Sequence, residues 1–239
     1  MYLLSYKMML YKITKFVQRL NLFINHFFRN SFNEKKFYKS LKNENFILFD
    51  LGSNLGTFTK FFLKNTIIKN LKIYSFEPNN DLFRLQKNIF KRSKNIVIDN
   101  LAMSNSVGKL NFYQTKISSQ SSLKNNWIEE EDIEKSYWVQ TQTLDGYVTA
   151  NNIEIINFLK IDCEGSDLDI LKGAKNLLSS KKIRYIKIET YFQDEMKKNF
   201  QAINKFLIEN DYELFGINNV KYINNELQLC DSFYRPKFS

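Results

Sequence analysis

The sequence predicts an α/β fold in which a mostly parallel sheet is covered by helices. From Phe46 onward, short apolar runs alternate with amphipathic ones. Parallel strands need crossover connections, so this alternation favours a parallel sheet with helices against it. The composition agrees, because 44% hydrophobic and 15% aromatic residues provide enough apolar surface to offset the entropy of ordering. A chain of 239 residues has room for one such domain and an extension.

Residues 1–45 are expected to form an N-terminal extension, followed by the domain at 46–239. From Leu10 to Phe28, apolar residues recur at helical spacing and basic residues fall off the apolar stripe, which predicts a basic amphipathic helix. Such a helix can pack on its own domain, lie on an anionic membrane surface or dock a partner. The polar stretch Arg29–Asn45 is predicted to be a connector with a short helix. Neither a signal peptide nor a membrane-spanning helix is expected.

The first half of the domain is predicted to contain three strands and two helices. The first strand is an apolar run, the following helix carries three phenylalanines on one side, and the second strand is ended by a proline. Asn79 or Asn80 is the expected N-cap of the second helix. These elements are Phe46–Leu51, Thr57–Asn65, Lys72–Pro78, Asn80–Arg92 and Asn95–Asn100.

The middle of the domain interrupts this rhythm. A turn around Gly108 and the β-rich residues after it predict a hairpin-like edge. The polar stretch Lys116–Lys135 has no clear periodicity, and we expect a loop that lines the substrate side, because loops of this length inside a domain are usually functional or mobile. Tyr137–Val148 is predicted to begin as a strand and to end in a helix or turn.

The last third returns to alternating strands and helices. The predicted elements are a strand with a turn at Ile156–Gly165, a helix at Ser166–Ser180, a strand at Ile183–Tyr191 and an amphipathic helix at Asp194–Asp211. Two antiparallel strands, Tyr212–Ile217 and Tyr222–Phe233, are expected to finish the fold. Their turn is placed at Asn224 and Asn225.

The net charge and the cysteines constrain the partners and the compartment. A formal net charge of +10 favours anionic partners, although lysine is abundant throughout the chain and a general compositional bias explains the charge equally well. Cys163 and Cys230 form no C-x-x-C pair, which suits an unmetallated protein in a reducing compartment. The expected location is the cytoplasm, with peripheral contact at the inner membrane face through residues 1–30 as a further option.

A glycine turn and an acid indicate a nucleoside cofactor. Gly52 and Gly56 follow a strand and precede a helix, where backbone amides can approach a ligand. A pyrophosphate site would have G-x-G-x-x-G, but position 54 is asparagine. Glu77 ends the second strand, where an acid can accept both ribose hydroxyls. This combination suits a cofactor with an ammonium group, and S-adenosylmethionine is such a molecule.

Two carboxylates end a later strand. Asp162 and Glu164 flank Cys163, and an extended backbone would point both side chains the same way. Such a pair can provide a base or hold a divalent cation. The alternative is that Asp162 is held by turn amides while Glu164 or Asp167 caps the next helix.

The motifs resemble the FkbM family of S-adenosylmethionine-dependent methyltransferases. The resemblance covers Phe46–Tyr191 and is carried by blocks in the order typical of the family: FDLGSNLGTFT, SFEPNNDLFRLQKNI, NLAMSNSVGKLNFY, SSL, VQTQTLDGYV and FLKIDCEGSDLDILKGA. It implies a class I methyltransferase (Rossmann-like) fold with a mostly parallel seven-stranded sheet, one reversed strand and helices on both faces. It also implies O-methylation of sugars, glycans or other hydroxylated metabolites.

The resemblance also assigns site residues. Those that match the family's first cofactor motif are Asp50, Gly52, Ser53, Asn54 and Gly56. Glu77 matches the ribose-binding acid, and Asn100 and Leu101 stand where such folds contact adenine. Asp162 and Glu164 match the D-x-E-G motif near the reactive methyl group. Ser53 and Cys163 are mild departures from the residues usual at their positions.

A hydroxyl acceptor needs a group that takes its proton. His26 lies outside the resembling region, which leaves carboxylates, and we expect Asp162, Glu164 or Glu189 to act as base or cation ligand. Lys160 could share their face and pair with one of them. The alternatives are an RNA methyltransferase and a membrane-surface or partner-docking protein with a non-catalytic nucleoside site; Gly52-x-x-x-Gly56 disfavours a nicotinamide-dependent oxidoreductase. No nucleic-acid partner is expected, because no RNA-binding module is visible.

Overall fold

The computed structural model describes residues 32–42, 45–117, 120–192 and 199–237. The chain divides into two units, Met1–Asn33 and Glu34–Ser239. The predicted amphipathic helix, its membrane contact and His26 lie outside the described residues. All that follows concerns the unit that begins at Glu34.

The domain is built on a seven-stranded sheet with the order β3-β2-β1-β7-β8-β10-β9. Five strands pair in parallel, while β10 is antiparallel to both of its neighbours. This confirms the predicted mostly parallel sheet with one reversed strand. The strands are β1 (Phe46–Leu51), β2 (Leu71–Phe76), β3 (Ile96–Asp99), β7 (Ile156–Ile161), β8 (Ile183–Tyr191), β9 (Tyr212–Ile223) and β10 (Glu226–Pro236).

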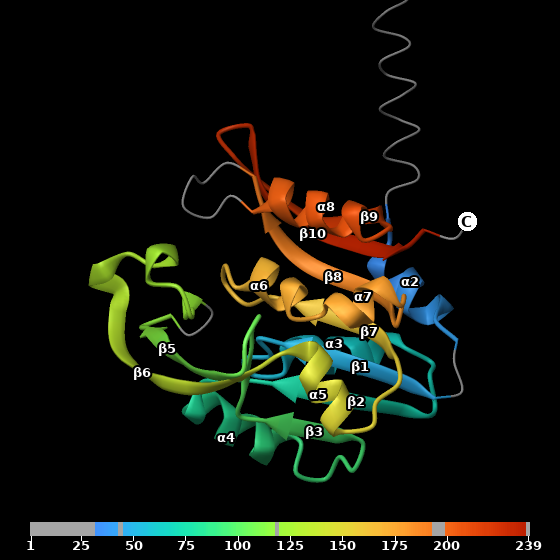
Figure 1. The fold of residues 1–239 in the computed structure, drawn as a ribbon, viewed down its shortest axis with the longest axis horizontal. Coiled ribbons are helices and arrows are strands. Elements are labelled where there is room, and N and C mark those ends of the chain that lie inside the picture. The colour runs from blue at the N-terminus through green and yellow to red at the C-terminus, as the bar shows by residue number, and fades with distance from the viewer. Residues whose placement is uncertain (1–31, 43–44, 118–119, 193–198, 238–239) are drawn as a thin grey trace, which may run out of the picture. The chain divides into compact units, whose positions relative to one another are not determined.

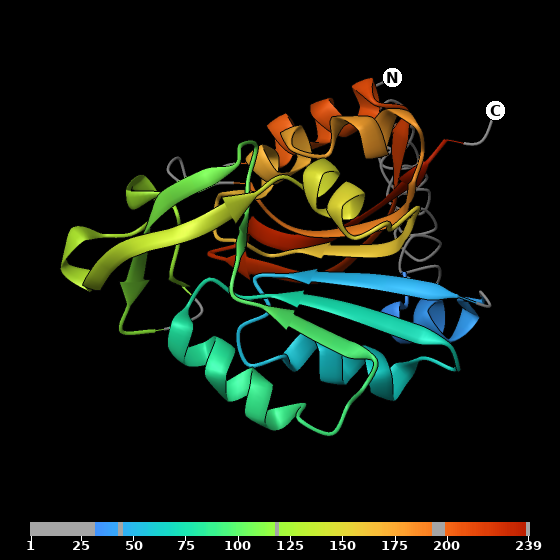
Figure 2. The same cartoon turned by 60° about the horizontal axis from the view of Figure 1, so that its bottom comes forward.

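Helices cover both faces of this sheet (Figures 1 and 2). One face carries α2 (Glu34–Ser40), α3 (Thr57–Asn65) and α4 (Asn80–Ile89). The other carries α5 (Leu144–Ala150), α6 (Asp167–Lys172), α7 (Lys175–Ser179) and α8 (Phe200–Glu209). The predicted helix at Ser166–Ser180 is therefore two short helices, and they meet at Gly173 and Ala174. Part of the predicted helix Asp194–Asp211 lies outside the described residues.

A second sheet stands at the end toward which the parallel strands point (Figure 2). It has the order β4-β6-β5, formed by β4 (Ala102–Met103), β5 (Gly108–Thr115) and β6 (Ile133–Gln142). The predicted edge hairpin is thus a small separate sheet, and β6 begins inside the stretch Lys116–Lys135 that was expected to be a loop. That stretch also contains two 3₁₀ turns, Asn125–Trp127 and Glu130–Asp132.

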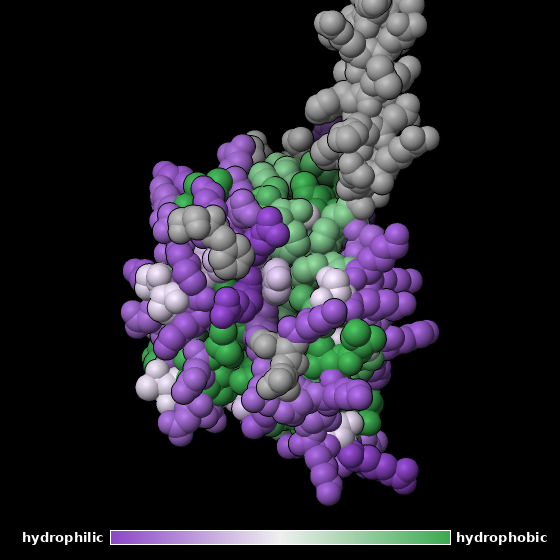
Figure 3. All heavy atoms as spheres, turned by 90° about the vertical axis from the view of Figure 1, so that its right-hand side faces the viewer, coloured by the Kyte–Doolittle hydropathy of each residue, from purple (hydrophilic) through white to green (hydrophobic). Residues whose placement is uncertain are grey.

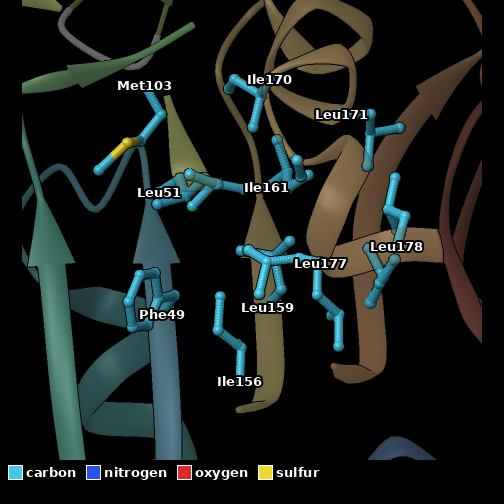
Figure 4. Close-up of a cluster of buried hydrophobic side chains, with 14 of the residues drawn as sticks. Phe49, Leu51, Met103, Ile156, Leu159, Ile161, Ile170, Leu171, Leu177 and Leu178 are labelled. Atoms are coloured by element: carbon cyan, nitrogen blue, oxygen red, sulfur yellow. The ribbon is translucent and has the colours of Figure 1, made fainter. Parts of the chain in front are cut away.

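The main core lies between the sheet and the helices α5 to α8 (Figure 4). Leu159 and Ile161 of β7 are fully buried and face Leu177 and Ile170 on the helices. Because successive side chains of a strand alternate between its faces, Lys160 faces the opposite side, toward α3. One strand thereby supplies core on one face and charge on the other.

Aromatic rings fill much of the α3 face. The ring of Phe158 packs against Phe58 and Phe62 of α3 and against Tyr38 of α2. Tyr38 is fully buried. Helix α2 therefore packs on the sheet, and the compact unit begins before Phe46, the expected start of the domain.

The C-terminal strands form the predicted antiparallel pair. Asn224 and Asn225 both have positive φ angles, 51° and 65°, in the turn that joins β9 to β10. The face shown in Figure 3 carries mainly hydrophilic side chains, with hydrophobic ones gathered in its middle. Within the described part of the chain, every helix is too short or too polar to cross a membrane.

Candidate active site

The glycine turn after β1 requires its two glycines. Gly52 has a φ of 66°, and a Cβ there would overlap the carbonyl oxygen of Asp162. Gly56 has a φ of 69°, and a Cβ there would overlap the ring of Phe90. Asn54 also adopts a left-handed conformation, with a φ of 50°, which asparagine tolerates better than most residues. The chain can therefore pass close to the end of β7.

Glu77 holds this turn from the end of β2. Its Oε2 accepts a hydrogen bond from the amide of Asn54 at 2.7 Å, and its Oε1 accepts one from the amide of Asn79 at 2.9 Å. Burial raises the pKa of Glu77 to about 7, although the two amide hydrogen bonds act in the opposite direction. Each carboxylate oxygen has further lone-pair capacity, which suits the ribose hydroxyls expected there.

A buried lysine joins β1 to β7 beneath the turn. Lys160 donates to the carbonyl oxygens of Leu51 and Gly52, at 3.1 and 2.9 Å. Its Nζ also lies 3.3 Å from Asp50 and 3.4 Å from Asp162. Burial disfavours the charge, but the carboxylates of Asp162 and Asp50 outweigh it and raise the pKa of Lys160. The expected pairing of Lys160 with a nearby carboxylate is confirmed.

Three carboxylates converge beside this lysine. Oxygen atoms of Asp162, Glu164 and Glu189 all lie within 4.8 Å of one another. They come from the turn after β7 and from the end of β8. Extended alternation does not bring them together, since β7 ends at Ile161 and Glu164 has a φ of 44°. The arrangement can accept a proton, or it can hold a divalent cation through oxygen ligands.

Glu189 is the member of this group that lies at the end of β8. Burial first, and then the charge of Asp162, raise its pKa to about 7. The hydroxyl of Tyr191 donates to its Oε2 at 2.8 Å. A carboxylate with a pKa near 7 is matched to proton transfer at neutral pH.

Asp167, and not Asp162, is held by the amides of the turn. Its carboxylate accepts hydrogen bonds from the amides of Cys163 and Gly165, both at 3.2 Å. Burial raises the pKa of Asp167 to about 6. The turn is thus fixed from within, and the carboxylate of Asp162 remains directed toward Lys160.

Two cavities open at this end of the sheet. The first has a volume of about 620 Å³ and runs from Glu77 and Leu101 to Glu164, Glu189 and Tyr191. The second has a volume of about 530 Å³ and lies on the α3 side of the sheet. The residues that line both are Gly52, Asn54, Thr57, Asp162 and Glu189.

Some of the predicted site residues line the cavities, and others hold the lining residues in position. Those that line the first cavity are Gly52, Asn54, Glu77, Leu101, Asp162, Glu164 and Glu189. Ser53 lines the second cavity and accepts a hydrogen bond from Gln86 at 2.7 Å. Asp50 lies beneath the site and accepts a hydrogen bond from Thr59 at 2.7 Å. Asn100 donates to the carbonyl oxygens of Glu77 and Pro78, so the contact of its side chain with adenine stays a prediction.

Several lining residues were not singled out from the sequence. Tyr191, Lys221 and Phe112 line the first cavity, as do Gln120 to Leu123 of the stretch expected to face the substrate. The hydroxyl of Ser122 donates to the carbonyl oxygen of Glu164 at 2.5 Å, which ties that stretch to the acidic turn. Ser122 belongs to the SSL block, and that block was the feature of the sequence from which this contact with the site could have been predicted.

The sheet order, the glycine turn and Glu77 together define a class I S-adenosylmethionine-dependent methyltransferase domain. The model of the methyltransferase FkbM domain family matches residues 50–214. The chain belongs to this family, whose methyl donor is S-adenosylmethionine.

The chain is similar to two methyltransferases. The hexuronic acid methyltransferase AglP of Haloferax volcanii is 29% identical over 151 residues, which are 62% of this chain and 57% of AglP. The crystal structure of methyltransferase FkbM from Methylobacillus flagellatus KT has the same fold, with a TM-score of 0.53 and 15% identity over 82% of this chain and 45% of that one. The chain thus spans about half the length of each relative.

Proposed function

We propose that this protein transfers the methyl group of S-adenosylmethionine to a hydroxyl group of a sugar. The observation that carries the proposal is the position of Asp162 and Glu189, which line both cavities while Glu77 stands at the far end of the first. The name of AglP, a hexuronic acid methyltransferase, supports a sugar as the acceptor class.

The chemistry asked of the protein is positioning and proton removal. S-adenosylmethionine, when bound, supplies an electrophilic methyl group on sulfur, which an acceptor oxygen attacks in line. Glu77 would hold the ribose, the glycine turn would bring its amides to the amino-acid end, and the acidic group orients the acceptor hydroxyl. Glu189 takes the hydroxyl proton as the oxygen–carbon bond forms and the carbon–sulfur bond breaks. Asp162, ion-paired with Lys160, fixes the hydroxyl by accepting a hydrogen bond.

The same three carboxylates offer a second way to orient the hydroxyl, through a divalent cation. The two routes differ in their response to chelation. If Glu189 acts as a base alone, EDTA leaves the rate unchanged; if a cation takes part, EDTA stops turnover and Mg²⁺ restores it.

The test is transfer of labelled methyl from S-adenosylmethionine to a panel of glycosides. Asp162→Asn and Glu189→Gln should each lower turnover by about a hundredfold or more, because general bases and their orienting groups contribute about 10²–10⁴ to rates. Binding of S-adenosylhomocysteine should stay within about threefold of wild type. The matched control is Asp169→Asn, which removes a carboxylate that pairs with Lys124 and lines neither cavity. Full activity of Asp162→Asn would remove Asp162 from the mechanism.

A further inference from the structure

The second cavity has an aromatic wall and a polar rim, and we call it the aromatic-walled cavity. Its wall consists of Phe58 and Phe61 of α3, both half-buried. Around them stand Glu34 of α2, Lys187 of β8, Asn218 of β9 and Asp231 of β10.

Its charged floor is produced by the register of the sheet. Asp50 of β1 lies opposite Lys160 of β7, Lys160 lies opposite Lys187 of β8, and Asp231 of β10 lies opposite Glu189 of β8. Residues in register across a sheet present their side chains to the same face. A row of charges therefore crosses four strands under the cavity, from Asp50 of β1 to Asp231 of β10, and it includes Glu189 of the acidic group.

The position of the cavity suits the acceptor of a methyl transfer. An in-line displacement needs the donor and the acceptor on opposite sides of the transferred carbon. Glu77 and Leu101, which the proposed function assigns to the nucleoside end of the donor, line the first cavity. Because Asp162 and Glu189 line both cavities, an acceptor in the aromatic-walled cavity would meet the methyl group at these carboxylates.

The lining matches the surface of a sugar ring. A pyranose has a face of C–H groups and a rim of hydroxyls, so it needs an apolar wall beside hydrogen-bonding groups. Phe58 and Phe61 provide the apolar wall. Asn218 and Asn219 of β9 provide hydrogen-bonding groups. The side-chain amide of Asn218 donates a hydrogen bond to Glu34 at 2.8 Å.

The charges of the lining disfavour an anionic sugar. Four carboxylates line the cavity, those of Glu34, Asp162, Glu189 and Asp231, against the two lysines Lys160 and Lys187. Both lysines are already paired twice. Lys187 lies 2.7 Å from Glu34 and 3.0 Å from Asp231, and Lys160 lies 3.3 Å from Asp50 and 3.4 Å from Asp162. A uronate would have to displace one of these carboxylates and face the others unscreened.

We propose that the aromatic-walled cavity binds the acceptor and that this acceptor is a sugar without a carboxylate. The inference rests on the proposed function, since it names the acceptor class of that reaction. It also separates this protein from AglP, whose name gives a hexuronic acid as its substrate.

The first experiment measures sugar binding to the protein loaded with S-adenosylhomocysteine. The probes are the methyl glycosides of glucose, galactose and mannose and the matching uronides, followed by saturation-transfer NMR. At least one neutral glycoside should bind about tenfold more tightly than its uronide, since about 1.4 kcal/mol of charge repulsion corresponds to that ratio. A uronide that binds more tightly than every neutral glycoside, or absence of binding by all neutral glycosides, would overturn the proposal.

The second experiment locates the binding. Phe61→Ala should weaken the neutral glycoside by about tenfold, as removal of an aromatic contact in a pocket commonly does. The matched control is Phe83→Ala, which removes a half-buried phenylalanine of α4 that lines neither cavity. If Phe61→Ala binds the glycoside normally while Leu123→Ala, in the first cavity, does not, the acceptor belongs in the first cavity and the proposal is wrong.

A third variant tests the charge argument directly. Asp231→Asn keeps the shape of the side chain and removes one of the two carboxylates paired with Lys187. The ratio of uronide to neutral glycoside binding should then rise by about fivefold or more, because a freed ammonium can pair with the uronate. An unchanged ratio, with a normal melting temperature, contradicts the charge argument. In every sample, binding of S-adenosylhomocysteine is measured as well: its absence would contradict the proposed function, whereas its presence without sugar binding contradicts this inference alone.

Discussion

At the scale of single residues, the carboxylate of Glu77 is held in one orientation in the unliganded protein. Both of its oxygens are fixed by backbone amides, and its pKa of about 7 places its ionisation within the physiological range. The ionised carboxylate is the better acceptor for ribose hydroxyls.

We therefore predict that affinity for S-adenosylhomocysteine rises as the pH increases through about 7, because Glu77 loses its proton there. Glu77→Gln should bind about tenfold or more weakly, as hydrogen bonds to charged groups contribute about 1.5–3 kcal/mol. It should also lose most of the pH dependence. Titration calorimetry from pH 6 to 8 measures both effects, and a wild-type affinity that falls with rising pH would refute the role of Glu77.

Gly52 is the second residue that shapes the site, because its left-handed conformation lets the turn after β1 pass close to Asp162. Gly52→Ala places a Cβ in a left-handed conformation and against the carbonyl of Asp162, so we expect a loss of about 2–5 kcal/mol from the free energy of unfolding. Denaturant unfolding measures it. The control is Gly146→Ala in α5, where the new Cβ meets side-chain atoms of Gln142 and Thr143 that can move. Equal stability of the two variants would show that the turn is not constrained as described.

At the scale of elements, Asn79 couples α4 to the site. Its side chain accepts hydrogen bonds from the amides of Asp81 and Leu82, and it donates to Gln114 of β5 at 3.0 Å. The same residue's amide binds Glu77. One asparagine thus caps the helix, contacts the small sheet and holds the carboxylate of Glu77.

Asn79→Ala should lower stability by about 1–2 kcal/mol, the usual cost of losing an N-cap. Asn79→Asp should recover most of the loss, because aspartate is an equally good cap. Thermal unfolding of the two variants provides the measurement. If both variants melt at the same reduced temperature, the contact with Gln114, and not the cap, is what Asn79 contributes.

The elements also show what the sequence could predict. Strands β1, β2 and β7 are buried along almost their whole length and consist mainly of apolar residues, so they were recognisable. The first half of β6 is polar and exposed at Glu134, Lys135 and Ser136, so nothing in its pattern separates it from a loop.

The candidate site also has a part that could be predicted from the sequence and a part that could not. Gly52, Glu77 and Asp162 belong to motifs that are local in sequence. The charged row under the aromatic-walled cavity depends on the register between β8 and β10, which pairs Glu189 with Asp231 across a long separation. Register of this kind is set by the packed fold and is not readable from either strand alone.

At the scale of the whole molecule, raised carboxyl pKa values should invert the usual dependence of stability on pH. In the folded protein burial raises the pKa values of Glu77 and Glu189 to about 7 and that of Asp167 to about 6, from ordinary values of 4.5 for glutamate and 3.8 for aspartate. The folded state therefore binds more protons than the unfolded chain between about pH 4 and 7, and stability falls as the pH rises across that window.

The prediction is a melting temperature lower at pH 8 than at pH 5.5 by about 4 °C or more, since 1 kcal/mol shifts a domain of this size by about 2–4 °C. Calorimetry of the unliganded protein measures it. The double variant Glu77→Gln/Glu189→Gln should flatten the profile. A melting temperature that rises with pH over this range would mean that these acids are ionised in the folded protein well below pH 7.

Residues 50–214 match the methyltransferase FkbM domain family, and titration calorimetry with S-adenosylhomocysteine and with NAD tests the proposed methyl transfer most directly. We expect saturable one-to-one binding of S-adenosylhomocysteine, weakened in Glu77→Gln, and no measurable heat with NAD. Absence of binding by S-adenosylhomocysteine, or tighter binding of NAD, would contradict it.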